Sequence, residues 1–126
     1  MREGPVTSKW GAMRAENGHP EPFGLKYIEI GNENFCPEYN TRYKVFYDAL
    51  KSAYPDIITI CNTHWEVGTE TKGLSVEIVD EHFYADDEFY QLYHDMYDHY
   101  DRSGPKIYVG EYAITVNNQK GALRGR

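Results

Sequence analysis

Residues 27–34 read YIEIGNEN, a short apolar run that ends in glycine, asparagine and glutamate. Side chains alternate between the two faces of a strand, so Glu29 and Glu33 share one face while Ile28 and Ile30 share the other. The isoleucines can pack against helices. The two carboxylates are then left on the opposite face, with Glu33 at the carboxyl end of the strand.

Three more strands and two longer helices are predicted around this first strand. Apolar runs bounded by turn formers predict four strands in all, at residues 25–30, 57–62, 76–84 and 106–113. Helical spacing of apolar residues predicts a short helix at 10–16, a helix that Asn40 or Thr41 caps and that runs to Tyr54, and a helix at 86–102. Strands that alternate with helices or long crossings imply a parallel sheet.

Four strands with two clear helices amount to half of an eightfold barrel. A complete barrel usually takes about 250 residues, whereas this chain has 126. We therefore expect an α/β fold that forms about half of a (β/α)8 TIM barrel, as one partial domain over residues 1–126. An open flavodoxin-like sheet is the alternative, but no phosphate-binding glycine loop follows the first strand.

Composition and charge exclude several classes of protein. A hydrophobic share of 40% argues against disorder, and a net charge of -7 would repel a phosphate backbone, so we expect no nucleic-acid partner. No apolar run is long enough to span a bilayer, and Met1–Lys9 lacks the apolar region of a signal peptide. Cys36 and Cys61 show no metal or disulfide spacing and are expected to be free thiols.

Polar side chains also mark the third and fourth predicted strands. On the third strand, alternation places on one face Ile78, Asp80, His82 and Tyr84. On the fourth strand, it places on one face Ile107, Val109 and Glu111. Because the carboxyl ends of parallel strands meet at one rim, we expect two glutamates, a histidine and a tyrosine to converge there.

Two carboxylates at one rim can divide the work of glycoside hydrolysis. Retaining glycosidases hold the two groups roughly 5–5.5 Å apart, whereas inverting enzymes need about 6.5–9.5 Å to admit a water molecule. One carboxylate stays ionised and attacks the sugar. Its charge raises the affinity of the other for a proton, so the second can act as an acid and later as a base.

The amino-acid sequence of several segments points to one family more specifically than the predicted geometry does. The segments YIEIGNEN and YVGEYA, at residues 27–34 and 108–113, resemble glycoside hydrolase family 51, the α-L-arabinofuranosidases. An Asn-Glu pair alone is typical of the wider clan of (β/α)8 glycosidases. Further segments similar to the family are WG at 10–11, RA at 14–15, GHPEPF at 18–23, DEHFY at 80–84 and YDR at 100–102.

This resemblance implies a role for each residue of the rim. The four strands would be barrel strands four to seven, with Glu33 as the acid/base and Glu111 as the nucleophile. Asn32 would bind the 2-hydroxyl of the sugar, while His82 and Tyr84 would support the two glutamates and line the arabinose pocket. The implied reaction is the retaining hydrolysis of terminal α-L-arabinofuranosyl groups from arabinose-containing polysaccharides or oligosaccharides. No metal and no organic cofactor is implied.

The remaining candidates have two interpretations each. Trp65, in the loop after the second strand, could stack on a sugar or cover the core. Asp80 and Asp86 beside His82 could mimic a metal cluster, but no second histidine lies at a ligand spacing, so we expect no metal site. Glu29 and Asp80 are expected to belong to a structural network.

The chain also departs from the family pattern. Phe35-Cys36 stands where members often have Trp-Gly, and the glycine-rich stretch after the nucleophile is replaced by residues 116–121. The other barrel strands and the accessory β-sandwich are missing, so we expect a fragment that self-associates through exposed barrel edges. The alternatives are another clan glycosidase, such as a cellulase or xylanase, and a truncated, inactive fragment that binds sugar.

Overall fold

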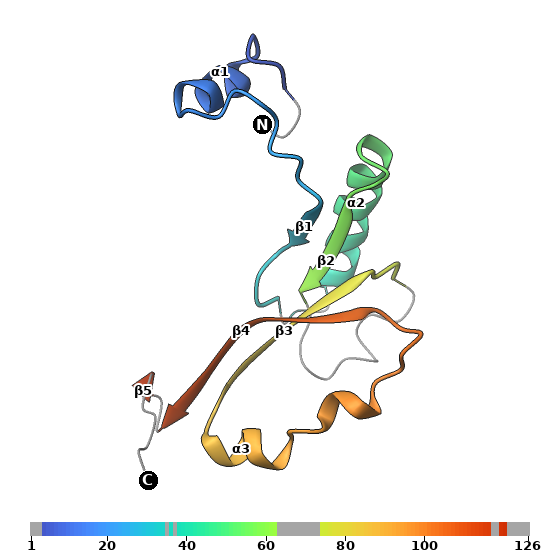
Figure 1. The fold of residues 1–126 in the computed structure, drawn as a ribbon. Coiled ribbons are helices and arrows are strands. Elements are labelled where there is room, and N and C mark those ends of the chain that lie inside the picture. Colours follow the sequence, from blue (N-terminus) through green and yellow to red (C-terminus); the bar gives the residue numbers. More distant parts are fainter. Residues whose placement is uncertain (1–3, 35, 37, 63–73, 117–118, 121–126) are drawn as a thin grey trace.

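A four-stranded parallel sheet forms the body of the chain, in a computed structural model that describes residues 4–34, 36, 38–62, 74–116 and 119–120. The strands lie in chain order and all pair in parallel (Figure 1). They are β1 (Tyr27–Ile30), β2 (Ile58–Asn62), β3 (Ile78–Ala85) and β4 (Lys106–Val116). The predicted α/β fold with a parallel sheet is confirmed, and each strand begins within two residues of its predicted start.

A short strand, β5 (Gln119–Lys120), was not predicted. It pairs in antiparallel fashion with the end of β4, where Thr115 lies opposite Lys120. The sequence carries no signal for this strand, because its two residues are polar and too few to show an alternating pattern. Most of the length of β4 is therefore left at the edge of the sheet, and so is the outer side of β1, within the residues described.

Helix α2 (Glu38–Ala53) packs against β1 and β2 (Figure 1). Its tyrosines recur every four residues and place a stacked row of rings on the sheet, in which Tyr43 is only 1% exposed. The helix begins before Asn40 and Thr41, so the predicted cap is wrong. Glu38 lies in the first turn, where a negative charge is favourable beside the unpaired N–H groups of a helix.

The predicted single helix over residues 86–102 is also wrong. The structure has a six-residue helix, α3 (Asp87–Leu92), and a separate 3-10 turn, η1 (Met96–His99). Leu92 and Tyr93, which helical spacing would place on one apolar stripe, are 66% and 54% exposed. A helix without a buried apolar stripe gains little from continuing, because most helical stability comes from packing.

The 3-10 turn is fixed by a buried carboxylate on β3. Glu81 is fully buried and accepts hydrogen bonds from the hydroxyls of Tyr97 at 3.2 Å and Tyr100 at 3.0 Å. With three residues per turn, a 3-10 helix brings side chains three apart to the same side. Burial raises the pKa of Glu81, against the lowering effect of these two hydroxyl groups.

A β-bulge changes which side chains share a face of β4. Glu81 lies opposite Val109 but His82 lies opposite Glu111, so Gly110 is one extra residue in β4. The prediction that Ile107, Val109 and Glu111 share a face is therefore wrong. Strict alternation holds only up to the bulge, beyond which the strand is turned by one residue.

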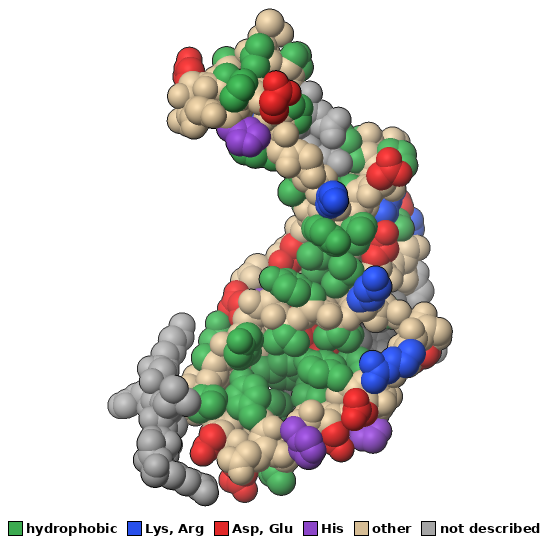
Figure 2. Space-filling model, in the orientation of Figure 1, with side chains coloured by type: hydrophobic (Ala, Val, Ile, Leu, Met, Phe, Trp, Pro, Cys, Tyr) green, Lys and Arg blue, Asp and Glu red, His purple; other side chains and the backbone are tan. Residues whose placement is uncertain are grey.

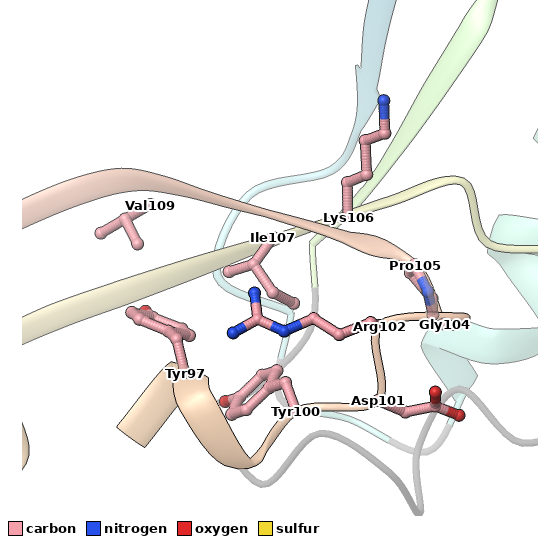
Figure 3. A pocket seen from close by; sticks show the side chains of 9 residues that line it. All are labelled: Tyr97, Tyr100, Asp101, Arg102, Gly104, Pro105, Lys106, Ile107 and Val109. Atoms are coloured by element: carbon pink, nitrogen blue, oxygen red, sulfur yellow. The ribbon is translucent and has the colours of Figure 1, made fainter. Parts of the chain in front are cut away.

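The positions of Ile107 and Val109 confirm that these two residues lie on the face of β4 opposite to Glu111. Ile107 and Val109 point toward Tyr97 and Tyr100 and line a cavity of about 590 Å³, whereas Lys106 points away from it (Figure 3). Apolar side chains gather over this region between β4 and the α3–η1 segment (Figure 2). The cavity lies on the side of the sheet opposite to Glu111.

The N-terminal segment lies apart from the sheet (Figure 1). It contains α1 (Lys9–Glu16), capped by Ser8, whose hydroxyl accepts the N–H of Gly11. Arg14 is 3% exposed, and its guanidinium donates to three backbone carbonyls, those of Gly4, His19 and Pro20. The segment is thus closed by its own residues. In the part of the chain described here, no helix has the length and apolar character needed to cross a membrane.

Candidate active site

Three side chains, one from the turn after β1 and two from within β3 and β4, converge on the face of the sheet opposite the cavity. His82 on β3 places Nδ1 at 3.4 Å from Glu33 Oε1 and at 3.9 Å from Glu111 Oε2. One potential ligand atom of each residue lies within 4.8 Å of those of the other two. The convergence predicted from the polar side chains of the strands is therefore present, although strict alternation along the fourth strand did not place Glu111 on the correct face.

Backbone conformation after β1 directs Glu33 toward this point. Gly31 has a φ of 97° and Glu33 a φ of 49°. A Cβ at Gly31 would lie 2.1 Å from Asn34 Nδ2, so the turn requires glycine there. A non-glycine residue in the left-handed region costs on the order of 1–3 kcal/mol and tends to occur at functional sites. The side chain of Glu33 is 45% exposed, open to a ligand.

Asn62, at the end of β2, fastens the turn that carries Glu33. It is 2% exposed; its Oδ1 accepts the N–H of Asn34 at 3.0 Å, and its Nδ2 donates to Glu29 Oε1 at 3.1 Å. Its own N–H donates to the hydroxyl of Tyr39, which in turn donates to the carbonyl of Ile30. Sequence reasoning missed Asn62, although a polar residue that ends an apolar strand was a usable signal.

Glu29 is exposed, and it joins this network through the hydrogen bond that it accepts from Asn62. Burial raises the pKa of Glu29, and the nearby charge of Asp80 raises it further, while the hydrogen bond from Asn62 lowers it. The net rise favours a proton on Glu29 at higher pH than usual. Its placement agrees with the predicted structural role.

Tyr84 holds the second glutamate. Its hydroxyl donates to Glu111 Oε2 at 2.5 Å. This hydrogen bond, followed by burial and the charge of Glu111, raises the pKa of the Tyr84 hydroxyl. A tyrosine that stays protonated keeps donating its hydroxyl proton to Glu111 and holds that carboxylate in place.

His82 lies between the two glutamates, and its other ring nitrogen is hydrogen-bonded to Asp80. His82 Nε2 lies 2.9 Å from Asp80 Oδ2, and a carboxylate can only accept, so Nε2 carries a proton. Burial lowers the pKa of His82, but the hydrogen bonds to Asp80 and Glu33, with the charges of Asp80 and Glu111, outweigh it and raise that pKa. The ring is thus poised to share a proton with Glu33.

The other two predicted site residues are placed less fully. Asn32 lies in the turn directly before Glu33, and it is exposed. Trp65 lies outside the described residues.

Glu33, His82 and Glu111 could each offer one ligand atom to a metal ion. Both ring nitrogens of His82 already face carboxylates, and its raised pKa means that a metal ion would compete with a proton for the ring. The arrangement suits proton exchange between an acid and a base more directly than cation binding. We assign none of the three as a metal ligand.

Paired carboxylates at this separation have a defined chemistry. Oxygens of Glu33 and Glu111 lie within 4.8 Å of each other, close to the roughly 5–5.5 Å between the acids of retaining glycosidases and below the about 6.5–9.5 Å of inverting ones. Tyr84 donates to Glu111, whereas His82 contacts Glu33, so the two carboxylates have different hydrogen-bonding neighbours.

Comparisons with known proteins agree on one family. Residues 2–102 match the family model described as the alpha-L-arabinofuranosidase 1 domain. The chain is 43% identical over 132 residues to an extracellular exo-alpha-L-arabinofuranosidase of Streptomyces chartreusis, covering 95% of this chain and 16% of that protein. It is 42% identical over 115 residues to alpha-L-arabinofuranosidase 1 of Arabidopsis thaliana, covering 89% of this chain and 16% of that protein.

A solved structure gives the same relationship in three dimensions. The arabinose-bound MgGH51 α-L-arabinofuranosidase matches with a TM-score of 0.74 and 32% sequence identity, over 97% of this chain and 19% of that chain. The chain therefore spans no more than about a fifth of the length of the relatives that it resembles.

Proposed function

Since the chain belongs to the α-L-arabinofuranosidases of glycoside hydrolase family 51, we propose that it carries the acid/base and the nucleophile of a retaining α-L-arabinofuranosidase. Glu33 is the proposed acid/base and Glu111 the proposed nucleophile. The observation that carries this assignment is the approach of their oxygens to within 4.8 Å. The proposed substrates are arabinose-containing polysaccharides and oligosaccharides.

The proposed reaction has two steps. Glu111 attacks the anomeric carbon while Glu33 gives its proton to the departing glycosidic oxygen, which forms a covalent glycosyl-enzyme and releases the aglycone. Glu33, now ionised, takes a proton from water, and the resulting hydroxide displaces Glu111 from the sugar. Asn32 is proposed to bind the 2-hydroxyl, a contact that strengthens in the transition state.

His82 and Tyr84 are proposed to keep the two carboxylates in opposite protonation states. Tyr84 donates to Glu111 and stabilises its charge. The neutral His82 ring, with its proton on Nε2, accepts at Nδ1 from protonated Glu33, and the charged ring donates from Nδ1 to ionised Glu33. The same contact therefore serves both steps of the reaction.

We also propose that the four parallel strands correspond to barrel strands four to seven of a (β/α)8 catalytic domain. Side by side, they bring together Glu33, which follows β1, His82 in the second half of β3, and Glu111 in the middle of β4. Barrel enzymes carry their active sites at the carboxyl-end face of the strands. Among the residues that the structure describes, no strand pairs with the outer side of β1, and only the end of β4 pairs on its outer side. Self-association through these edges is proposed for the chain on its own, and sedimentation velocity against concentration would test it.

Turnover of chromogenic glycosides tests the function. The chain should release 4-nitrophenol from the α-L-arabinofuranoside and not from the corresponding glucoside or xyloside, which a cellulase or xylanase would favour. Proton NMR of the first product in deuterated buffer should show retained anomeric configuration. Inverted product would exclude Glu111 as a nucleophile.

Variants assign the activity to the two glutamates. Glu111→Gln and Glu33→Gln should each abolish turnover of an arabino-oligosaccharide, whereas Glu88→Gln, an exposed acid on α3, should leave it unchanged. If no variant differs from the starting chain, the activity comes from a contaminant. If the chain shows no turnover but NMR titration shows arabinose binding at His82, the chain is a binding fragment.

A further inference from the structure

We propose that Asp80 is the positioning residue that aligns both glutamates of the site, Glu33 through His82 and Glu111 through the bulge at Gly110. The inference rests on the proposed function, because alignment matters only if both carboxylates react. Asp80 touches neither glutamate through a hydrogen bond described in the structure, and it is 2% exposed. It therefore acts through its two neighbours.

The first connection runs through the His82 ring. Asp80 Oδ2 accepts the proton of Nε2 at 2.9 Å, which fixes the tautomer and the tilt of the ring. Nδ1 is then left to face Glu33 Oε1 at 3.4 Å, as acceptor or donor according to the protonation of the pair. Without a carboxylate behind Nε2, the ring proton could move to Nδ1, and the neutral ring could no longer accept from protonated Glu33.

The second connection runs through the backbone of β4. Asp80 Oδ1 accepts the N–H of Gly110 at 2.7 Å. Gly110 is the extra residue of the bulge, and the bulge turns Glu111 to the side of the sheet on which His82 and Tyr84 lie. A regular strand would leave Glu111 on the face of Ile107 and Val109. Bulges next to active sites commonly redirect a side chain in this way.

The chemistry of a carboxylate explains why an acid is buried here. Each of its two oxygens accepts from a different donor, Gly110 N–H on one side and His82 Nε2–H on the other. An amide has a single acceptor oxygen, so asparagine can satisfy only one of the two. A buried acid beside Glu29 is costly for stability, and sheet packing alone would be served by an apolar side chain.

Asp80→Asn separates this role from folding, because asparagine has the same shape. The test uses the whole chain and nitrogen-15 NMR of the His82 ring and of the Gly110 amide. We expect one of two changes: the ring proton moves from Nε2 to Nδ1, or the Gly110 amide proton shifts upfield as its hydrogen bond is lost. If the variant keeps both the tautomer and the amide shift of the starting chain, the proposal is wrong.

Kinetics provide the second readout. With 4-nitrophenyl α-L-arabinofuranoside, kcat of Asp80→Asn should fall roughly 100-fold, the loss expected when a reacting group is displaced by about 1 Å, with KM little changed. Asp98→Asn, an acid whose side chain is 75% exposed, is the matched control and should keep kcat. A wild-type kcat in Asp80→Asn would overturn the proposal. If the starting chain shows no turnover, the proposed function fails for this chain, while the NMR result still decides the role of Asp80.

Discussion

Replacing Gly110 by alanine is expected to destabilise the chain and to displace Glu111. A Cβ at Gly110 would lie 2.5 Å from Asp80 Oδ1, 2.7 Å from Oδ2 and 2.9 Å from Cγ. These distances are shorter than any real Cβ contact, so either the Asp80 carboxylate rotates away or β4 moves. Rotation breaks the hydrogen bonds to Gly110 and His82, and movement of β4 shifts Glu111 at the next position.

The size of the effect follows from these two responses. Overpacking a well-filled site costs about 1–3 kcal/mol, and losing a hydrogen bond to a charged group costs about 1.5–3 kcal/mol. Since the two responses partly replace each other, we expect a loss of about 2–4 kcal/mol in the free energy of unfolding. Domains of this size have total stabilities of roughly 6–19 kcal/mol, so the variant should fold and remain measurable.

Urea denaturation followed by circular dichroism measures the loss. The matched control is Gly104→Ala, whose Cβ would meet no heavy atom closer than the Asp101 carbonyl oxygen at 3.2 Å, and which should cost less than about 1 kcal/mol. The double variant Gly110→Ala with Asp80→Ala lacks the clash. Its loss in the free energy of unfolding should therefore be smaller than the sum of the losses of the two single variants, by on the order of 1–3 kcal/mol. Equal stability of Gly110→Ala and Gly104→Ala, with normal turnover, would refute the role given to the bulge.

Three further outcomes are expected. Tyr39→Phe removes the hydroxyl that joins Ile30 and Asn62, and should lower the free energy of unfolding by about 1–3 kcal/mol in urea titrations, because a buried N–H loses its partner. Tyr84→Phe should lower kcat for an arabinofuranoside about 10- to 100-fold, because Glu111 loses the donor that stabilises its charge, and an unchanged kcat would contradict this. The folded pKa of His82 is raised above the unfolded value near 6.5, so its contribution to stability is fully present below that value and is lost as pH rises through the folded pKa. The melting temperatures of the chain and of His82→Asn should therefore converge as pH rises through this window. A constant difference between the two melting temperatures would count against this prediction.

The sheet was predictable because its signals are local. Each of the four parallel strands is an apolar run between turn formers, and the helices or long crossings between successive strands leave few topologies open. The candidate site was predictable for the same reason, since parallel strands carry Glu33 and His82 to one rim. The family resemblance then named the roles that geometry alone left open.

What escaped prediction depends on contacts between distant residues. Gly110 inside the fourth strand was a usable signal for a bulge, but its partner Asp80, thirty positions earlier, accepts the glycine N–H from another strand and has no local pattern. Residues 86–102 carry a helical pattern, yet Glu81 draws two tyrosines into a tighter turn. The position of Asn62 at the end of an apolar strand was a usable signal, but the groups that it joins, Asn34 and Glu29, lie on or after another strand.

The closure of the N-terminal segment by Arg14 has a consequence for the order of folding. Within the described residues, the carbonyls of Gly4, His19 and Pro20 that accept from this guanidinium lie within ten positions of it, so the loop to be closed is short. The parallel sheet, in contrast, must bring together segments separated by whole helices, which is entropically slower. On a ribosome, the first two dozen residues could complete their hydrogen bonds before the last strand emerges, and hydrogen exchange on stalled chains should find the α1 amides already protected.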